Sequence, residues 1–204
     1  SNGGTVMIWG EHGKARAKIG VEDEGGSFVL WGTDGKARSK MAAADQGGSM
    51  IIWGPDGQPR AALGVTGEGG VMGVSGNDGR ARAVMGVDAD GGDLRVFGND
   101  GRTRGVLSVE ADVGVMGVAG QDGKPRVGVG VNADEGFVNV YGDDGRVRGA
   151  MGVGDGGGDV RVYGSDGVAH ACLGVGSEGG MMYAQNTDGE VTTTLPRRGR
   201  PARV

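Results

Sequence analysis

The chain has 204 residues, 49 of them glycine and five of them proline, and a formal net charge of −5. The glycines do not fall at every third position, which excludes collagen, and the recurring apolar pattern argues against disorder. The acidic balance argues against a nucleic-acid groove, the single cysteine excludes an intrachain disulfide framework, and no apolar run reaches the 18 residues of a membrane span.

One sequence pattern recurs every 22 residues without insertion or deletion, as in residues 142–153. A strict period of this length is typical of a repeat architecture, in which each unit contacts mainly its neighbours. Nine copies are present. The glycine that closes the Asp-Gly pair marks them at Gly13, Gly35, Gly57, Gly79, Gly101, Gly123, Gly145, Gly167 and Gly189.

Each copy contains two alternating runs. In the first run, two positions such as Val160 and Val162 are apolar in all nine copies, while the residue between them varies. The second run, as in residues 14–21, places basic residues on one face and apolar ones on the other. This alternation predicts β-strands with one face always buried, and the glycine inside most of the second runs disfavours a helix.

Two kinds of link join the runs. Gly-x-Asp-Gly predicts a type I turn closed by a glycine bulge, with positive φ at the second glycine. The other link is acidic and glycine-rich, as in residues 87–92, and fits either a second hairpin or a solenoid corner. The sequence therefore leaves open antiparallel hairpins or parallel coils, the latter rising about 43 Å over nine layers at roughly 4.8 Å each.

We thus predict an all-β protein of nine 22-residue, two-strand repeats. The repeats would form an elongated β-rod over residues 1–195, of the β-solenoid or triple β-helix type or a hairpin array. Residues 196–204 form a basic tail with four arginines, expected to be a solvated end and not a phosphate-binding arm. No signal peptide opens the chain, and Ser1 lies so close to the first run that missing upstream residues are expected.

A column of aromatic residues occupies the face opposite the constant apolar positions. Its members are Trp9, Trp31, Trp53, Phe97, Tyr141 and Tyr163. They either lie over glycines of the next strand or are buried against another chain. The variable face turns polar later in the chain (Arg95, Asn139, Arg161), so the N-terminal third is the expected contact region.

The search for chemistry yields no catalytic residue, cofactor site or metal site. His12 replaces the turn aspartate and His170 the recurring arginine, which indicates drift within a repeat, and Cys172 is expected to be a neutral thiol. The acidic links are expected to be solvated loops, since they lack the order of Ca²⁺-binding β-helix repeats. The Asp and Arg columns are expected to interleave and fix register.

The Asp-Gly-Lys-x-Arg-Ala and Leu-Gly-Val repeat resembles tandem β-repeats of bacterial proteins and the trimeric shafts of viral and phage fibres. Hairpin arrays of the MORN type are a further analogy, without their aromatic-Gly signature. The resemblance implies a structural, self-assembling fibre, filament or surface shaft, extracellular, on a cell surface or in a virion appendage. Expected partners are copies of the chain, with a trimer favoured, or another surface or fibre protein. The alternative is a scaffold that binds a protein or glycan through the aromatic column.

Overall fold

A computed structural model describes residues 3–22, 25–111, 113–132, 135–177 and 179–194. The chain divides into two compact units, residues 1–111 and 112–204, called unit 1 and unit 2. The basic tail at 196–204 lies outside the described residues.

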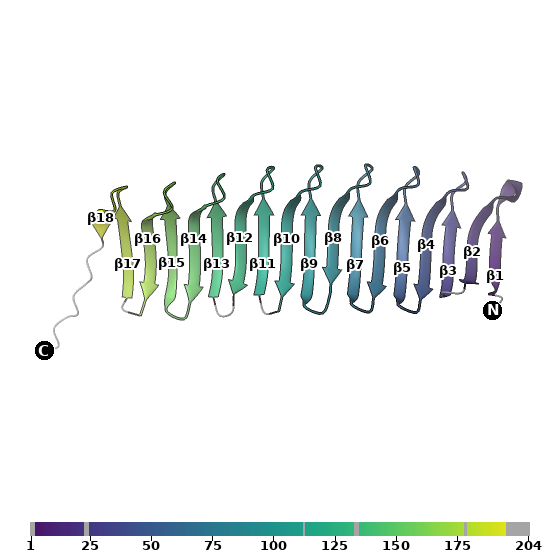
Figure 1. Ribbon diagram of the computed structural model, residues 1–204, viewed down its shortest axis with the longest axis horizontal. Helices are drawn as coiled ribbons and strands as arrows, with labels where there is room; N and C mark the ends of the chain where they lie inside the picture. The colour runs from purple at the N-terminus through teal and green to yellow at the C-terminus, as the bar shows by residue number, and fades with distance from the viewer. Residues whose placement is uncertain (1–2, 23–24, 112, 133–134, 178, 195–204) are drawn as a thin grey trace. The chain divides into compact units, whose positions relative to one another are not determined.

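Unit 1 is an antiparallel sheet of ten strands that follow one another in chain order (Figure 1). A short 3₁₀ turn, η1 (Glu11–Gly13), lies between its first two strands. The strands are β1 (Thr5–Trp9), β2 (Ala15–Glu22), β3 (Gly25–Trp31), β4 (Ala37–Ala44), β5 (Gly47–Trp53), β6 (Pro59–Thr66), β7 (Gly69–Ser75), β8 (Ala81–Val87), β9 (Gly91–Phe97) and β10 (Thr103–Glu110).

Unit 2 repeats the same arrangement with eight strands. They are β11 (Val113–Ala119), β12 (Pro125–Asn132), β13 (Glu135–Tyr141), β14 (Val147–Gly154), β15 (Gly157–Tyr163), β16 (Ala169–Gly176), β17 (Gly179–Gln185) and β18 (Val191–Thr194). Odd-numbered strands are the first runs of the repeat and even-numbered strands are the second runs.

Within each unit, every strand pairs with the next one along the chain. In unit 1, β7 pairs with β8 through Met72 and Met85, and β8 pairs with β9 through Met85 and Leu94. In unit 2, β13 pairs with β14 through Val138 and Met151. The prediction of a β-solenoid or triple β-helix is therefore wrong, and the hairpin array is confirmed. Both links are short enough to return the chain antiparallel beside itself, so no parallel coil forms.

The Gly-x-Asp-Gly turns have the geometry that their sequence predicts. In the turn after β13, the N–H of Gly145 donates to the carbonyl of Gly142 at 3.0 Å, and the N–H of Gly142 donates to Arg146 at 2.8 Å. All nine turn glycines have positive φ, from 67° at Gly13 to 85° at Gly57. In the eight turns that follow the odd strands from β3 to β17, an aspartate or asparagine side chain caps the loop, so the hairpin follows directly from local chemistry.

Gly145→Val and Gly79→Val should each destabilise the sheet by about 1 kcal/mol or more, because L side chains disfavour positive φ. A Cβ at either position meets nothing within 4 Å, so only backbone strain acts. Gly67→Val is the matched control, since that glycine also faces open space but does not have positive φ. Thermal melts should show a lower midpoint for the two turn variants than for the control. Equal midpoints for all three variants would refute the turn assignment.

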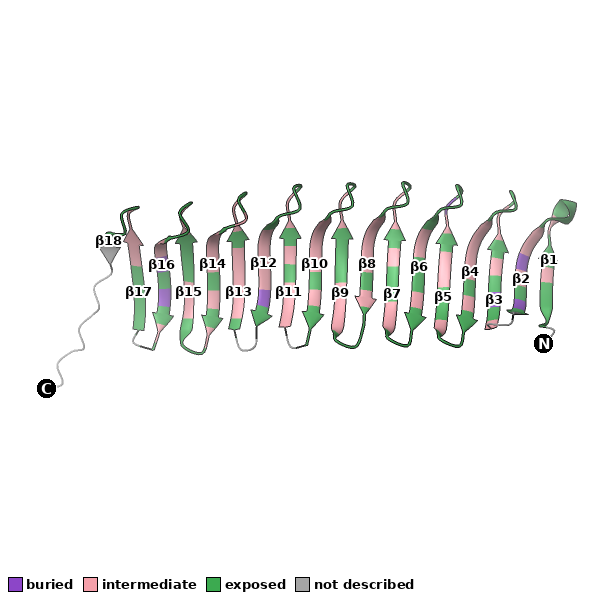
Figure 2. Ribbon diagram, in the orientation of Figure 1, coloured by how far each residue is buried: buried purple, intermediate pink, exposed green. Residues whose placement is uncertain are grey.

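Neither face of the sheets is covered by a second layer within its own unit. The strands lie edge to edge, so the second run of a repeat extends the sheet and does not pack on the first run. Among the described residues no large side chain is fully buried, and the buried side chains are Ala17, Ser27 and Cys172 (Figure 2). The prediction of one always-buried strand face is therefore wrong for the single chain.

Candidate interaction face

The constant apolar positions line up as a continuous row across each sheet. In unit 1 the cross-strand partners run from Met50 to Leu63, Met72, Met85 and Leu94, one residue on each successive strand. In unit 2 the same row contains Val129, Val138, Met151, Val160 and Leu173. We call this the central row, and the side of the sheet that carries it the apolar face.

A further row lies on each side of the central row. Toward the Gly-x-Asp-Gly turns, odd strands carry a large residue and even strands mostly a small one, as in the pair Val74 and Ala83. Toward the acidic links the order reverses, as in the pair Gly70 and Val87. Most strands therefore present one large central residue, with a large neighbour on one side and a small neighbour on the other; β4, β12 and β17 are exceptions.

The apolar face offers almost no polar group. Ser39 is the only residue with a polar side chain in its three rows where the structure describes side chains. Most large side chains of the central row are exposed, for example Phe28 at 37% and Ile19 at 57% in unit 1, and Leu173 at 57% in unit 2. Patches of this extent are rare on monomers and typically mark an interaction surface.

The opposite, polar face carries the aromatic column at the ends of odd strands. Among its members only Trp9 is exposed, at 61%, and the other five are half-buried. A Cβ on Gly128 would lie 3.5 Å from the hydroxyl of Tyr141, so that ring lies beside a neighbouring glycine. The largest uncovered apolar surface thus belongs to the other face, which the sequence-based interface hypothesis did not select.

The turn edge of each sheet is organised by the Asp and Arg columns. In the repeat at β14, one carboxylate oxygen of Asp144 accepts the N–H of Arg146 at 3.0 Å and the other accepts Arg148 Nη2 at 2.5 Å. The same i,i+4 ion pair joins Asp34–Arg38, Asp56–Arg60, Asp78–Arg82, Asp100–Arg104 and Asp122–Arg126. The aspartate therefore shapes the turn and holds the arginine at once.

Basic side chains also connect each turn to the next one. Arg16 Nη1 donates to the carbonyl of Gly32 at 2.6 Å, and Arg148 Nη1 donates to Gly164 at 2.7 Å. Lys124 Nζ donates to the carbonyl of Asp143 at 2.9 Å. The turn edge is thus a chain of charge-assisted hydrogen bonds that fixes the spacing of successive hairpins.

His170 takes over the role of the arginine in its repeat. Its Nε2 lies 3.0 Å from Asp166 Oδ2, and its Nδ1 lies 3.2 Å from the carbonyl of Gln185 in the next turn. Asp166, and then the Gln185 carbonyl, raise the pKa of His170, because both favour the protonated ring. The protonated His170 therefore stabilises the fold at pH values below its ordinary pKa of 6.5, and this stabilisation is lost as the pH rises through the raised pKa.

The turn aspartates should make stability fall in acid. The amide of Arg146, followed by the guanidinium of Arg148, holds the pKa of Asp144 below its ordinary value of 3.8. A lowered pKa stabilises the fold above the ordinary value, and the effect is lost as the pH falls through the lowered one. Asp144→Asn should therefore lose less stability than the wild type between pH 7 and pH 3, as measured by urea unfolding. Asp155→Asn, at the link edge, is the control and should behave as the wild type; an unchanged acid loss in Asp144→Asn would contradict the assignment.

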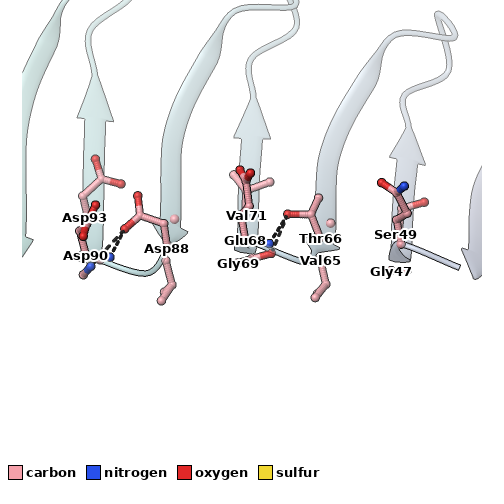
Figure 3. A pocket seen from close by; sticks show the side chains of 18 of the residues that line it. Gly47, Ser49, Val65, Thr66, Glu68, Gly69, Val71, Asp88, Asp90 and Asp93 are labelled. Carbon is pink, nitrogen blue, oxygen red and sulfur yellow. Dashed lines mark hydrogen bonds between the residues drawn. The ribbon is translucent and has the colours of Figure 1, made fainter. Parts of the chain in front are cut away.

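The link edge is acidic and bears a shallow hollow in unit 1 (Figure 3). Asp88 Oδ1 accepts the amides of Asp90 at 3.0 Å and Gly91 at 3.1 Å, and Thr66 Oγ1 accepts the amide of Glu68 at 3.3 Å. These side chains therefore build tight turns. In the part of the chain that the structure describes, no group of three or more His, Cys, Asp or Glu is placed to hold a metal ion. The acidic residues Asp23, Glu24 and Asp134 lie outside that part.

The remaining candidate residues are not gathered into one site. His12 has φ 64° within η1, at one end of unit 1, whereas Cys172 is buried on the polar face of unit 2 between Arg161 and Tyr183. No helix in the described ranges is long and apolar enough to cross a membrane. No protein-family description matches the chain, and no curated protein is similar to it.

Proposed function

We propose that this chain is a non-catalytic structural protein whose copies assemble into a fibre, filament or surface shaft. The observation that carries the proposal is the uncovered apolar face, whose central row is about half exposed and lacks charge. Hydrophobic burial is the main source of folding free energy, and a single-layer sheet obtains little of it alone. Copies of the same chain supply the missing layer.

The regular turn edge supports a structural role. Successive hairpins are held together by backbone pairing and, as at Arg16, Lys124 and Arg148, by basic side chains bound to a carbonyl of the next turn, so each sheet extends by similar steps. Such an extended surface suits a shaft outside a cell or on a virion. The polar face, with the aromatic column, would then face solvent or another surface or fibre protein.

The alternative, a scaffold that binds a protein or glycan, rests on the aromatic column. Tyr163 and Arg161 lie two residues apart on the polar face of β15, a combination of ring and charge that suits a polar ligand. This role does not require that the apolar face be covered by further copies.

Negative-stain electron microscopy of the purified chain tests the proposal. We expect particles of uniform width that are larger than one chain, because several copies share each apolar face. Particles no larger than a single 20.5 kDa chain would favour the scaffold and contradict the fibre.

A further inference from the structure

We infer that three copies of the chain pack around a common axis through their apolar faces, with the turn edge of each copy against the link edge of the next. This inference rests on the proposed function and names the surface and symmetry through which the copies assemble. It is argued from the sizes, charges and area of the rows in unit 1.

The two outer rows of the apolar face are complementary to each other. On β7, the turn-side residue is Val74 and the link-side residue is Gly70; on β8, they are Ala83 and Val87. If the turn side of one copy meets the link side of an identical copy at the same level, Val74 faces glycine and Ala83 faces valine. In unit 1 every level except that of β4, whose outer residues Ser39 and Ala43 are both small, then combines one large and one small side chain, which gives even packing along the axis.

The central row indicates three copies and not two. Two stacked sheets lie about 10 Å apart over their whole width, which would suit rows of equal size. If three sheets of seven-residue strands, each about 23 Å wide, form the sides of a triangle, the common axis lies about 6–7 Å above the middle of each sheet. Above an outer row, the plane midway to the neighbouring sheet lies only about 3 Å away. The central residue of every strand is large, as Leu63, Met85 and Leu107 are, and the small residues are confined to the outer rows. This taper fits a three-sided core.

The charges of the two edges are also complementary. In unit 1 the turn edge carries more basic than acidic residues, with Arg80 and Arg82 beside Asp78 in one turn. The described link-edge charges of unit 1 are all acidic, including Asp45, Glu68 and Asp88. A cyclic arrangement brings these unlike edges together at every contact, whereas an arrangement of like edges would oppose equal charges.

The apolar face of unit 1 alone supplies a large part of the area that a stable contact needs. Ten strands with three rows give a flat projection of about 600 Å² in unit 1 alone, from about 4.8 Å per strand and about 3.3 Å per residue. Because the side chains project from the sheet, the accessible area of this face exceeds its flat projection. Stable interfaces bury about 800 Å² on each partner. Glycans are poor occupants of this face, because its side chains offer almost no hydrogen-bonding group.

The test compares charged substitutions on the two faces of the same strands. Leu63→Glu, Met85→Glu, Leu107→Glu and Met151→Glu, combined, place charges in the central row. The matched control combines Ala62→Glu, Val84→Glu, Val106→Glu and Ala150→Glu, which lie one residue away on the polar face. Sedimentation equilibrium should give three times the single-chain mass for the control, and single-chain mass or loss of the β-sheet signal for the central-row variant. A central-row variant that keeps the three-copy mass would overturn the inference.

Thiol reactivity keeps the test decisive if the charged variant fails to fold. In a Cys172→Ala background, Met85→Cys and Val84→Cys are treated with iodoacetamide under native conditions. In the single chain Met85 is 44% exposed, whereas Val84 is half-buried and therefore less accessible. Without assembly, a cysteine at 85 should react as fast as one at 84, or faster. Assembly should make residue 85 react at least about tenfold more slowly than residue 84. Equal rates would reject the apolar face as the contact.

The outcomes separate this inference from the proposed function. A wild-type mass of two copies would overturn the three-sided arrangement and leave self-assembly intact. A large assembly that dissociates only with the polar-face variant would overturn the choice of face. A single-chain mass for the wild type would overturn both.

Discussion

Gly47→Ala is expected to lower the stability of unit 1 by about 2–3 kcal/mol, a large effect for a single methyl group. Gly47 has φ 139°, and a Cβ there would lie 1.8 Å from the carbonyl oxygen of Val65 on the neighbouring strand. The backbone at the link must move to relieve this overlap, which disrupts the pairing of β5 with β6. Urea unfolding followed by circular dichroism measures the loss.

Gly64→Ala is the matched control for this substitution. A Cβ at Gly64 would lie 3.8 Å from Val71 Cγ1, an ordinary contact, and its φ is not positive. The control should change stability by less than about 0.5 kcal/mol. In two other repeats, Val113 and Glu135 occupy the position equivalent to Gly47, and neither has positive φ. A similar stability for Gly47→Ala and Gly64→Ala would show that the close approach at the link does not constrain the fold.

Thermal unfolding of the wild type should depend strongly on protein concentration. The single chain buries few side chains and no large one fully among its described residues, so under the proposed assembly most hydrophobic stabilisation comes from contacts between copies. When folding is coupled to association, mass action raises the unfolding midpoint with concentration. We expect the midpoint to rise by several degrees over a hundredfold increase in concentration.

A monomeric fold predicts a different result for the same experiment. Its midpoint would be independent of concentration, and dilution would leave the β-sheet signal unchanged. The matched control with four glutamates on the polar face should show the same concentration dependence as the wild type, because its substitutions leave the central row intact. A constant midpoint for the wild type would contradict coupling between assembly and folding.

The sequence predicts the hairpin turns well because their chemistry is local. In an Asp-Gly pair, the glycine adopts positive φ and the aspartate carboxylate accepts a hydrogen bond from a nearby amide, as Gly79 and Asp78 show. The acidic link does not have this property. A glycine-rich link such as residues 87–92 is compatible with a hairpin or a solenoid corner, so the sequence could not exclude the solenoid.

The faces of the sheet show a second limit of sequence reasoning. Alternation places Val160 and Val162 on one face, but burial also needs a covering layer, and the second run joins the same sheet instead. The tryptophans directed the interface hypothesis to the opposite face because they are large, although five of the six aromatic residues are already half-buried. The Arg148 bond to Gly164 was also beyond the sequence, because it depends on the spacing of successive turns.

Sedimentation equilibrium of the unmodified chain tests most directly the claim that copies of this protein cover its apolar face. We predict a single species of three times the 20.5 kDa chain mass, with the β-sheet signal retained. A species of single-chain mass with the same β-sheet signal would contradict the claim, because the apolar rows would then be stable in water without a partner.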